Sequence, residues 1–432
     1  MIQQQIQPTL QVGILSGTSI RFCLEKGYAL DGACYQGEQC VTIEVGKIRF
    51  HDGLYDELLF IGHDGHSTFC LHDVVIGIHF HWERKEDQRF VGDLRIIVED
   101  ERLTAVNVIG VEDYLQSVIS SEMSAQSHLE LLKAHAVISR SWVLRPILNP
   151  DTEATAYGED TATRHIRWYE RDAHKHFDVC ADDHCQRYQG ITRQTSDRVA
   201  EAVRTTWGEV LMYEGKICDA RFYKSCGGAT ERFEHCWAVV KHPYLRPIRD
   251  ARSSVFPDLT QEEEAEQWIM SPPEAFCNTT DKRILSQVLN GYDQETRDFY
   301  RWQVHYGVAE LSDLVRARSG IDFGEIRDLR PMKRGESGRI YELEICGSKR
   351  TMVVGKELEI RKWLSPSHLY SSAFVVKKEN GGFTLYGAGW GHGVGLCQIG
   401  AAVMATQGYG YREILAHYFP SAEVRRIGQV GN

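Results

Sequence analysis

The stretch VIGVEDYLQSVISSEMSAQSHLELLKAHAVISRSWVLRPI, residues 108–147, decides how this chain is organised. Its first part has an apolar stripe at helical spacing, which predicts a short helix that ends near residues 120–123. Ser127 and Glu130 then form an S-x-x-E capping box, which predicts the start of a second helix that Pro146 ends. The second helix is apolar on all sides, so we expect it to be buried.

Glu122 falls between these two helices. A carboxyl group there is either a solvated residue at a helix end or a desolvated acid between apolar walls. The buried second helix carries Arg140, and burying a guanidinium is costly without a partner. Glu122 is the partner that we expect for Arg140.

Residues upstream and downstream of this stretch differ in character. Short runs rich in Val, Ile and Phe predict a β-rich N-terminal region. His79 and His81 share a strand face there, and two half-exposed histidines are a simpler interpretation than a metal pair, because no third ligand is near. We predict an α+β fold of mixed helices and antiparallel sheets around a central groove, with an N-terminal β-rich extension. Its expected parts are residues 1–105, a first core part at 106–250, an acidic helical insert at 251–300 and a second core part at 301–432.

The composition excludes several classes of protein. The 432 residues include 49 Lys and Arg against 60 Asp and Glu, a net charge of −11, which argues against a nucleic-acid partner. No apolar run approaches about 18 residues, so no transmembrane segment is expected. The N-terminus has no basic region followed by a long apolar run, which predicts a cytoplasmic protein; the alternative is an exported protein whose leader is missing. Twelve dispersed cysteines favour free thiols in a reducing compartment.

A histidine and cysteine cluster interrupts the polar segment at 147–190. Cys180 and Cys185 have a spacing usual for zinc ligands, and His184 with His174 could complete four ligands, with His176 as the substitute for His174. A closed set of four ligands is typical of structural zinc. A Cys180–Cys185 disulfide and a cluster without metal remain open.

Two further stretches carry polar groups beside glycines. In RFYKSCGGAT (221–230), Tyr223, Lys224 and Ser225 could bind a ligand near a Gly-Gly turn, although a strand that ends in a glycine turn explains the same pattern.

The second stretch is GAGWGHGVGLCQIGA (387–401), which holds Trp390, His392 and Gln398. It lacks the Lys of a phosphate-binding loop and the Ser of a nucleophile elbow. A Trp that can stack on a sugar ring and a Gln that can bond hydroxyls suit an uncharged polar ligand, and a tight structural loop with a buried His is the alternative.

Five blocks occur in a fixed order: VEDYLQSVISSEM, LKAHAVISR, HCQRYQG, FYKSCGG and GAGWGHGVGLCQIGA. Together they resemble the stage II sporulation protein D family, also called the LytB or amidase-enhancer family, over residues 105–240 and 300–425. The sequence departs from the family pattern in two places. His135 stands where the pattern has Gln, and Leu396-Cys397 stands where it has Met-Ser.

The resemblance implies a lytic transglycosylase that cleaves the MurNAc–GlcNAc bond of peptidoglycan strands lacking stem peptides. One carboxyl group suffices for that chemistry, because the sugar's own 6-hydroxyl replaces water. The implied catalytic residues are Glu122, Arg140 and Tyr223; the implied substrate-binding residues are Ser225, Lys224, Trp390, His392 and Gln398; and the implied structural zinc ligands are His174, Cys180, His184 and Cys185. The expected partners are glycan strands and an amidase. The alternatives are a non-catalytic glycan-binding protein that stimulates an N-acetylmuramoyl-L-alanine amidase and a zinc hydrolase centred on the His/Cys cluster.

Overall fold

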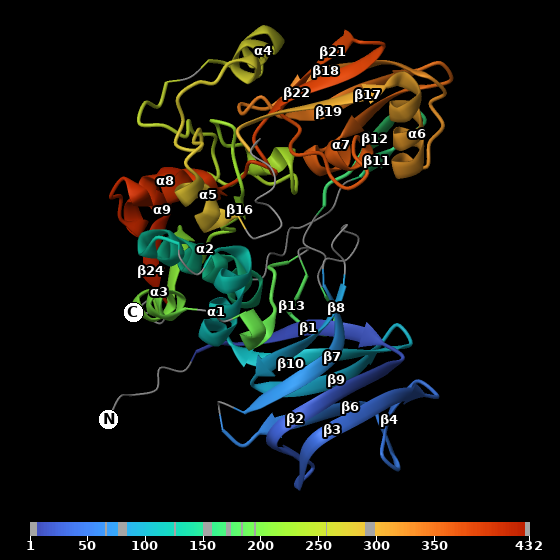
Figure 1. The fold of residues 1–432 in the computed structure, drawn as a ribbon, viewed down its shortest axis with the longest axis vertical. Coiled ribbons are helices and arrows are strands. Elements are labelled where there is room, and N and C mark those ends of the chain that lie inside the picture. Colours follow the sequence, from blue (N-terminus) through green and yellow to red (C-terminus); the bar gives the residue numbers. More distant parts are fainter. Residues whose placement is uncertain are drawn as a thin grey trace.

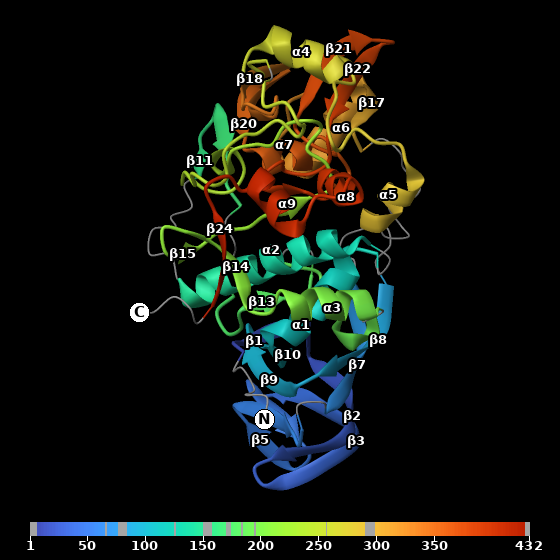
Figure 2. The same cartoon turned by 90° about the vertical axis from the view of Figure 1, so that its left-hand side faces the viewer.

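The structure is a computed structural model that describes residues 7–64, 67–76, 84–124, 127–149, 158–169, 174–182, 185–193, 196–255, 257–289 and 299–427. His79, His81 and His184 lie outside these ranges. The molecule has three parts along its long axis, and both views give the same order (Figures 1 and 2): an N-terminal sheet at one end, a helical part in the middle and a second strand-rich unit at the other end.

The N-terminal region forms a large sheet, as its alternating pattern predicts. Along one strand, Leu58 and Phe60 are buried while Leu59 and Ile61 point to solvent, which is the period of two that a half-buried strand requires. Neighbouring strands of this region pair antiparallel in every described ladder. The strands are β1 (Thr9–Gly17), β2 (Ser19–Leu30), β3 (Ala33–Glu44), β4 (Lys47–Phe50), β5 (Gly53–Tyr55), β6 (Glu57–Gly62), β7 (Thr68–Ile76), β8 (Arg84–Val91), β9 (Asp93–Glu99) and β10 (Arg102–Gly110).

The two predicted helices follow directly as α1 (Val111–Glu122) and α2 (Leu129–Leu148). The burial of α2 is confirmed. The predicted capping box is wrong: the N-cap is His128, whose Nδ1 accepts from Glu130 N at 3.3 Å, because the Ser127 hydroxyl donates elsewhere, to Ser124 O at 2.7 Å. Pro146 lies inside the last turn, so the helix ends two residues later than expected.

The chain then crosses the middle part and reaches it again at its C-terminus. Helix α8 packs on α2 and on α5, and α9 packs on α2, so the end of the chain (red in Figure 1) lies against the helices that follow the N-terminal sheet. β16 and β23 pair in parallel, which joins the FYKSCGG block to the glycine-rich block. The elements here are β13 (Val179–Cys180), η1 (Gly190–Arg193), α3 (Asp197–Thr205), β14 (Glu209–Tyr213), β15 (Lys216–Ile217), β16 (Phe222–Tyr223), η2 (Phe233–His235), α5 (Lys282–Val288), β23 (Leu396–Cys397), α8 (Gln398–Thr406), α9 (Tyr411–Tyr418) and β24 (Glu423–Arg426).

The distal unit has an apolar core of its own, built from residues between Trp302 and Leu385. Residues 394–419 belong instead to the large core that the N-terminal sheet and the helices share. The elements of the distal unit are β11 (Glu159–Asp160), β12 (Arg164–Ile166), α4 (Glu262–Met270), β17 (Arg301–Gly307), α6 (Val308–Ser319), β18 (Ile326–Arg334), β19 (Ile340–Gly347), β20 (Thr351–Gly355), α7 (Glu357–Trp363), β21 (Phe374–Glu379) and β22 (Gly382–Ala388).

The predicted fold class is confirmed: the chain is an α+β protein with a strand-rich N-terminal region. Among the described residues, no helix combines the length and the apolar character that crossing a membrane requires.

Candidate functional site

Glu122 is the last residue of α1 and is half-buried. One of its carboxyl oxygens, Oε1, accepts a hydrogen bond from the backbone N–H of Arg187 at 3.3 Å. The turn that follows is held by one residue of α5: Ser124 N donates to Gln287 O at 3.0 Å, and His128 N donates to Gln287 Oε1 at 2.8 Å. Ser124 and His128, which follow Glu122, are therefore both tied to α5.

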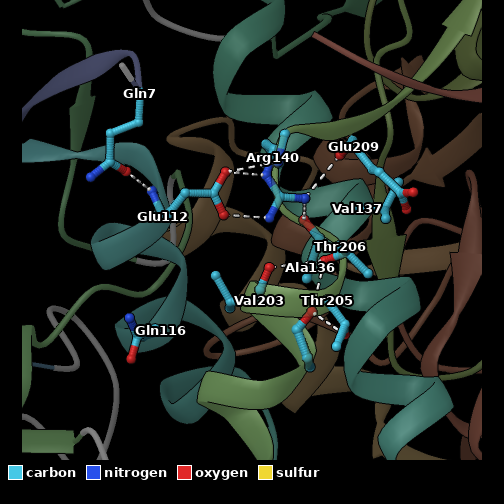
Figure 3. Close-up of polar contacts among 12 residues, drawn as sticks. Gln7, Glu112, Gln116, Ala136, Val137, Arg140, Val203, Thr205, Thr206 and Glu209 are labelled. Carbon is cyan, nitrogen blue, oxygen red and sulfur yellow. Dashed lines mark hydrogen bonds and ion pairs between the residues drawn. The ribbon is translucent and has the colours of Figure 1, made fainter. Parts of the chain in front are cut away.

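The expected ion pair between Glu122 and Arg140 is wrong. Arg140 is completely buried and pairs with Glu112, at the start of α1, through two bonds of 2.8 and 2.6 Å (Figure 3). A third bond, from Nη1 to Glu209 O at 2.9 Å, ties this pair to β14, and Gly208 N donates to Glu112 Oε1 at 3.2 Å. Arg140 thus fastens α1 to α2 and β14 and does not face solvent.

Tyr223 and Lys224 lie where β16 ends. Tyr223 is buried, its hydroxyl is 3.5 Å from Gly395 O, and burial raises the pKa of this phenol well above its usual value, so it stays a hydrogen-bond donor. Lys224 Nζ donates to Val288 O at 2.8 Å. Consecutive residues, Gln287 and Val288, therefore hold both the turn after Glu122 and the side chain of Lys224.

Two backbone hydrogen bonds between Ser225 and Trp390 join the two glycine-bearing blocks. Ser225 N donates to Trp390 O at 3.0 Å, and Trp390 N donates to Ser225 O at 2.7 Å. Gly389, which precedes Trp390, has φ +77°, and a Cβ there would lie 2.8 Å from Ser225 O, so the close approach requires glycine. The half-buried Trp390 ring packs against two aromatic rings, with centroid distances of 4.3 Å to Tyr370 and 4.7 Å to Phe299. Ser225 is completely buried, whereas Trp390 retains an accessible surface.

Both ring nitrogens of His392 bind backbone groups. Nε2 is 3.1 Å from Phe222 O, and Nδ1 accepts from Val394 N at 3.1 Å, which requires a neutral ring with its proton on Nε2. Burial, reinforced by nearby Arg221, lowers the pKa of His392 well below its usual value. We expect His392 to hold the loop rather than to offer a free nitrogen to a ligand.

Gln398 is buried at the start of α8 and contacts the residue that departs from the family pattern. Its Nε2 lies 3.4 Å from Nε2 of His135, whose Nδ1 is 3.2 Å from Ser139 Oγ. Burial, with a smaller contribution from Lys224, lowers the pKa of His135 to about 3. His135 is therefore a neutral link between α2 and the glycine-rich block.

The predicted His/Cys cluster is partly described and fits a zinc ion. The ligand atoms of His174, Cys180 and Cys185 lie within 4.8 Å of one another, with Cys185 Sγ 3.5 Å from His174 Nε2. His184, the expected fourth ligand, lies outside the described residues, and His176 is exposed. Such an ion would crosslink the loop that, two residues after Cys185, places Arg187 N–H against Glu122.

The sequence thus identified candidate site residues in four separate segments. The structure adds contacts to these residues that the sequence did not reveal. Gln287 and Val288 come from the acidic insert, whose composition gives no sign of a role at the site. A cavity of about 320 Å³ lies beside the loop at 177–189, and its lining includes Arg187 but not Glu122.

The placement of Arg140 gives a first prediction. Replacing Arg140 with Met leaves the Glu112 carboxylate buried without its partner, so the free energy of unfolding should fall by about 3–5 kcal/mol in urea denaturation. The double variant Glu112→Leu/Arg140→Met should recover most of that loss, and Arg425→Met, which removes an exposed pair with Glu423, should cost less than about 1 kcal/mol. Wild-type stability in Arg140→Met would contradict this structural role.

The burial of His135 gives a second prediction. In the unfolded chain the pKa of His135 is about 6.5, and in the folded chain it is about 3. Between these values the unfolded state binds a proton and the folded state does not, so the free energy of unfolding falls as the pH drops below about 6.5. Between pH 7 and pH 5 the wild type should lose about 2 kcal/mol more unfolding free energy than His135→Gln does. Parallel pH profiles of the two proteins would show that His135 is not held neutral.

Comparisons with known proteins agree with the motif pattern. Residues 99–213 match the family model described as stage II sporulation protein, and residues 231–395 match a domain of unknown function, DUF8618.

An uncharacterized protein of Brachyspira hyodysenteriae is 26% identical over 78% of this chain and 72% of its own length. The amidase enhancer of Bacillus subtilis is 27% identical over 71% of this chain, a match that spans 39% of that protein. Stage II sporulation protein D of Bacillus amyloliquefaciens is 24% identical over 74% of this chain and 75% of its own length. The domain match at residues 99–213 and the relatives named stage II sporulation protein D support the resemblance of this chain to the stage II sporulation protein D family.

Proposed function

We propose that this protein is a lytic transglycosylase that cleaves the MurNAc–GlcNAc bonds of peptidoglycan strands lacking stem peptides, with Glu122 as its single acid/base. The observation that carries the proposal is the position of Glu122: a half-buried carboxyl group at a helix end, with one oxygen held by a backbone N–H. The names of the relatives, stage II sporulation protein D and amidase enhancer, support a role at the cell wall.

The surroundings of Glu122 suit a group that gives up a proton and takes one back. The C-terminal end of α1 carries negative partial charge, which disfavours an anion there, whereas the Arg187 N–H stabilises the carboxylate once it forms. A carboxyl group that donates a proton and takes one back must pass through both forms during one reaction.

The proposed reaction needs no water. Glu122 donates its proton to the glycosidic oxygen as the bond from that oxygen to C1 of MurNAc breaks. The 6-hydroxyl oxygen of the same MurNAc forms a new bond to C1, and its proton passes to the Glu122 carboxylate. The products are a strand with a free GlcNAc 4-hydroxyl and a strand that ends in 1,6-anhydro-MurNAc, and Glu122 is again protonated.

We assign the half-buried side chain of Trp390 to the sugar ring, because Tyr370 and Phe299 fix its position. Lys224 directly follows β16, and its ammonium group is held by Val288 O. Ser225 and Gln398 are buried, so we assign them to the support of these loops. Zinc held by His174, Cys180 and Cys185 would supply a structural crosslink for the loop that carries Arg187.

The second candidate function is non-catalytic binding of glycan that stimulates an amidase. Two observations favour it: a relative bears the name amidase enhancer, and two of the expected substrate-binding groups do not reach solvent. In that case the same surface would hold the strand, and Glu122 would only contact it.

Cleavage products distinguish the two functions. Purified protein with peptide-free glycan strands should yield fragments that end in 1,6-anhydro-MurNAc, each one water lighter than a hydrolysis product in mass spectrometry. Glu122→Gln should reduce the rate by at least about 100-fold, because an amide cannot shuttle the proton. Glu201→Gln, the same change at an exposed position of α3, should leave the rate unchanged.

Several outcomes would refute the proposal. Fragments with reducing ends would mean hydrolysis with a second catalytic group. Glu122→Gln with the wild-type rate would remove Glu122 from the reaction. Strand binding without any cleavage by the wild type would favour the amidase-stimulating function.

A further inference from the structure

A second group of metal-ligating side chains lies deep in the middle part of the molecule, away from the His/Cys cluster. It consists of Cys226, Asp250, Cys277 and Cys397, and none of the four is more than 2% exposed. Their ligand atoms all lie within 4.8 Å of one another. Cys226 and Cys397 belong to the two glycine-bearing blocks, Cys277 belongs to the acidic insert, and Asp250 lies at the border of that insert.

The polar atoms of these side chains point at one another. Cys226 Sγ is 3.3 Å from Cys277 Sγ and 3.3 Å from Asp250 Oδ2. The third sulfur, Cys397 Sγ, accepts the N–H of Cys226 at 3.3 Å. A tetrahedral zinc ion with Zn–S bonds of about 2.3 Å separates its sulfur ligands by roughly 3.8 Å, so small side-chain adjustments would seat one here.

The surroundings of the cluster are those of a metal-bound thiolate set. Besides the bond from Cys226, Cys397 Sγ accepts from Gly400 N at 3.4 Å, and Cys226 Sγ accepts from Gly228 N at 3.4 Å. Backbone N–H groups directed at sulfur stabilise negative charge on it and orient the ligand. The bond from Gly400 N is also the N-cap contact of α8, so the start of that helix fixes the position of Cys397 Sγ.

Asp250 is the observation that separates a metal site from a packed group of thiols. Its Oδ1 accepts from Tyr418 OH at 2.6 Å, and its Oδ2 accepts from Cys277 N at 3.0 Å while facing the sulfur of Cys226. The basic side chain beside it, His417, has its Nε2 3.5 Å from Oδ1, and this buried nitrogen makes no hydrogen bond within the described part of the chain. At 3.5 Å His417 is a distant partner for a completely buried carboxylate, and a divalent cation bound through Oδ2 would offset the cost of that burial more fully.

A disulfide explains the cluster less well. Cys226, Cys277 and Cys397 are free thiols, and the sulfurs of Cys226 and Cys277 are 3.3 Å apart, whereas a disulfide bond measures about 2.05 Å. A Cys226–Cys277 bond would also leave Cys397 and Asp250 without a function in the group.

We propose that Cys226, Asp250, Cys277 and Cys397 bind one thiophilic divalent cation of the Zn²⁺ class in a closed, four-ligand site. Four protein ligands and complete burial leave no open position for substrate or water, so the ion is structural. It fastens the acidic insert to the two blocks that carry Ser225 and Gln398, next in sequence to Cys226 and Cys397. The proposal does not depend on the glycan-cleaving function.

The test first removes the other candidate zinc site. In the full-length double variant Cys180→Ala/Cys185→Ala, any tightly bound zinc reports on the buried cluster. After growth with added zinc and dialysis, this protein should retain about one zinc ion per chain by elemental analysis. Adding Cys277→Ser to that background should reduce the zinc content at least about tenfold, whereas Cys218→Ser, which changes a buried thiol outside the cluster, should leave it unchanged.

A second measurement needs no change in the cluster. X-ray absorption at the zinc edge of the double variant should show three sulfur ligands and one oxygen ligand. The expected bond lengths are about 2.3 Å for Zn–S and about 2.0 Å for Zn–O. If the purified double variant contains no zinc and is nevertheless folded by circular dichroism, the proposal is overturned. So would a Cys226–Cys277 disulfide in the peptide map of non-reduced protein, or a zinc edge with two or fewer sulfur ligands.

Discussion

The ion pair between Arg140 and Glu112 is the interaction on which the rest of the structure depends. It lies in the core, and both groups are almost completely buried. The two charges are tolerated because the guanidinium makes two bonds to the carboxylate and a third to the backbone of β14. An apolar contact would hold α1 against α2 equally well but would let the helices slide; the paired hydrogen bonds fix one register.

That register determines where Glu122 lies. Glu112 is at the start of α1, and Glu122 follows ten residues later, about 15 Å along the same helix. The pair anchors one end of a rigid element, and the other end carries the candidate acid. From there the site is completed by segments distant in sequence, with Arg187 contacting Glu122 from the loop after the His/Cys cluster and Gln287 bracing the turn from the insert. An acid/base residue needs this kind of support because small displacements of a catalytic group are costly.

The sequence predicts the elements better than it predicts the contacts between them. Apolar periodicity located α1, α2 and the N-terminal strands, because the burial of one face leaves a repeat that can be read directly. The same periodicity could not choose a partner for Arg140, since Glu112 and Glu122 flank the same apolar stripe of α1. Only the path of β14, which supplies Glu209 O and Gly208 N, makes the start of the helix the buried end. The role of Gln287 was equally hidden, because a backbone carbonyl and a single amide leave no pattern in sequence.

The two departures from the family pattern lie behind the candidate site rather than on its surface. His135 replaces Gln and contacts buried Gln398, while Cys397 replaces Ser and faces Cys226 and Asp250 within the core. Both residues meet at the start of α8: Cys397 is its N-cap, and His135 of α2 contacts its first residue, Gln398. A substitution in this second layer can change how the loop is held without changing what the loop presents, because Trp390 and Glu122 are positioned by other contacts. In this chain, therefore, the two departures fall on residues that support the loop, and Trp390 and Glu122, the residues proposed to contact a glycan strand, keep the family pattern.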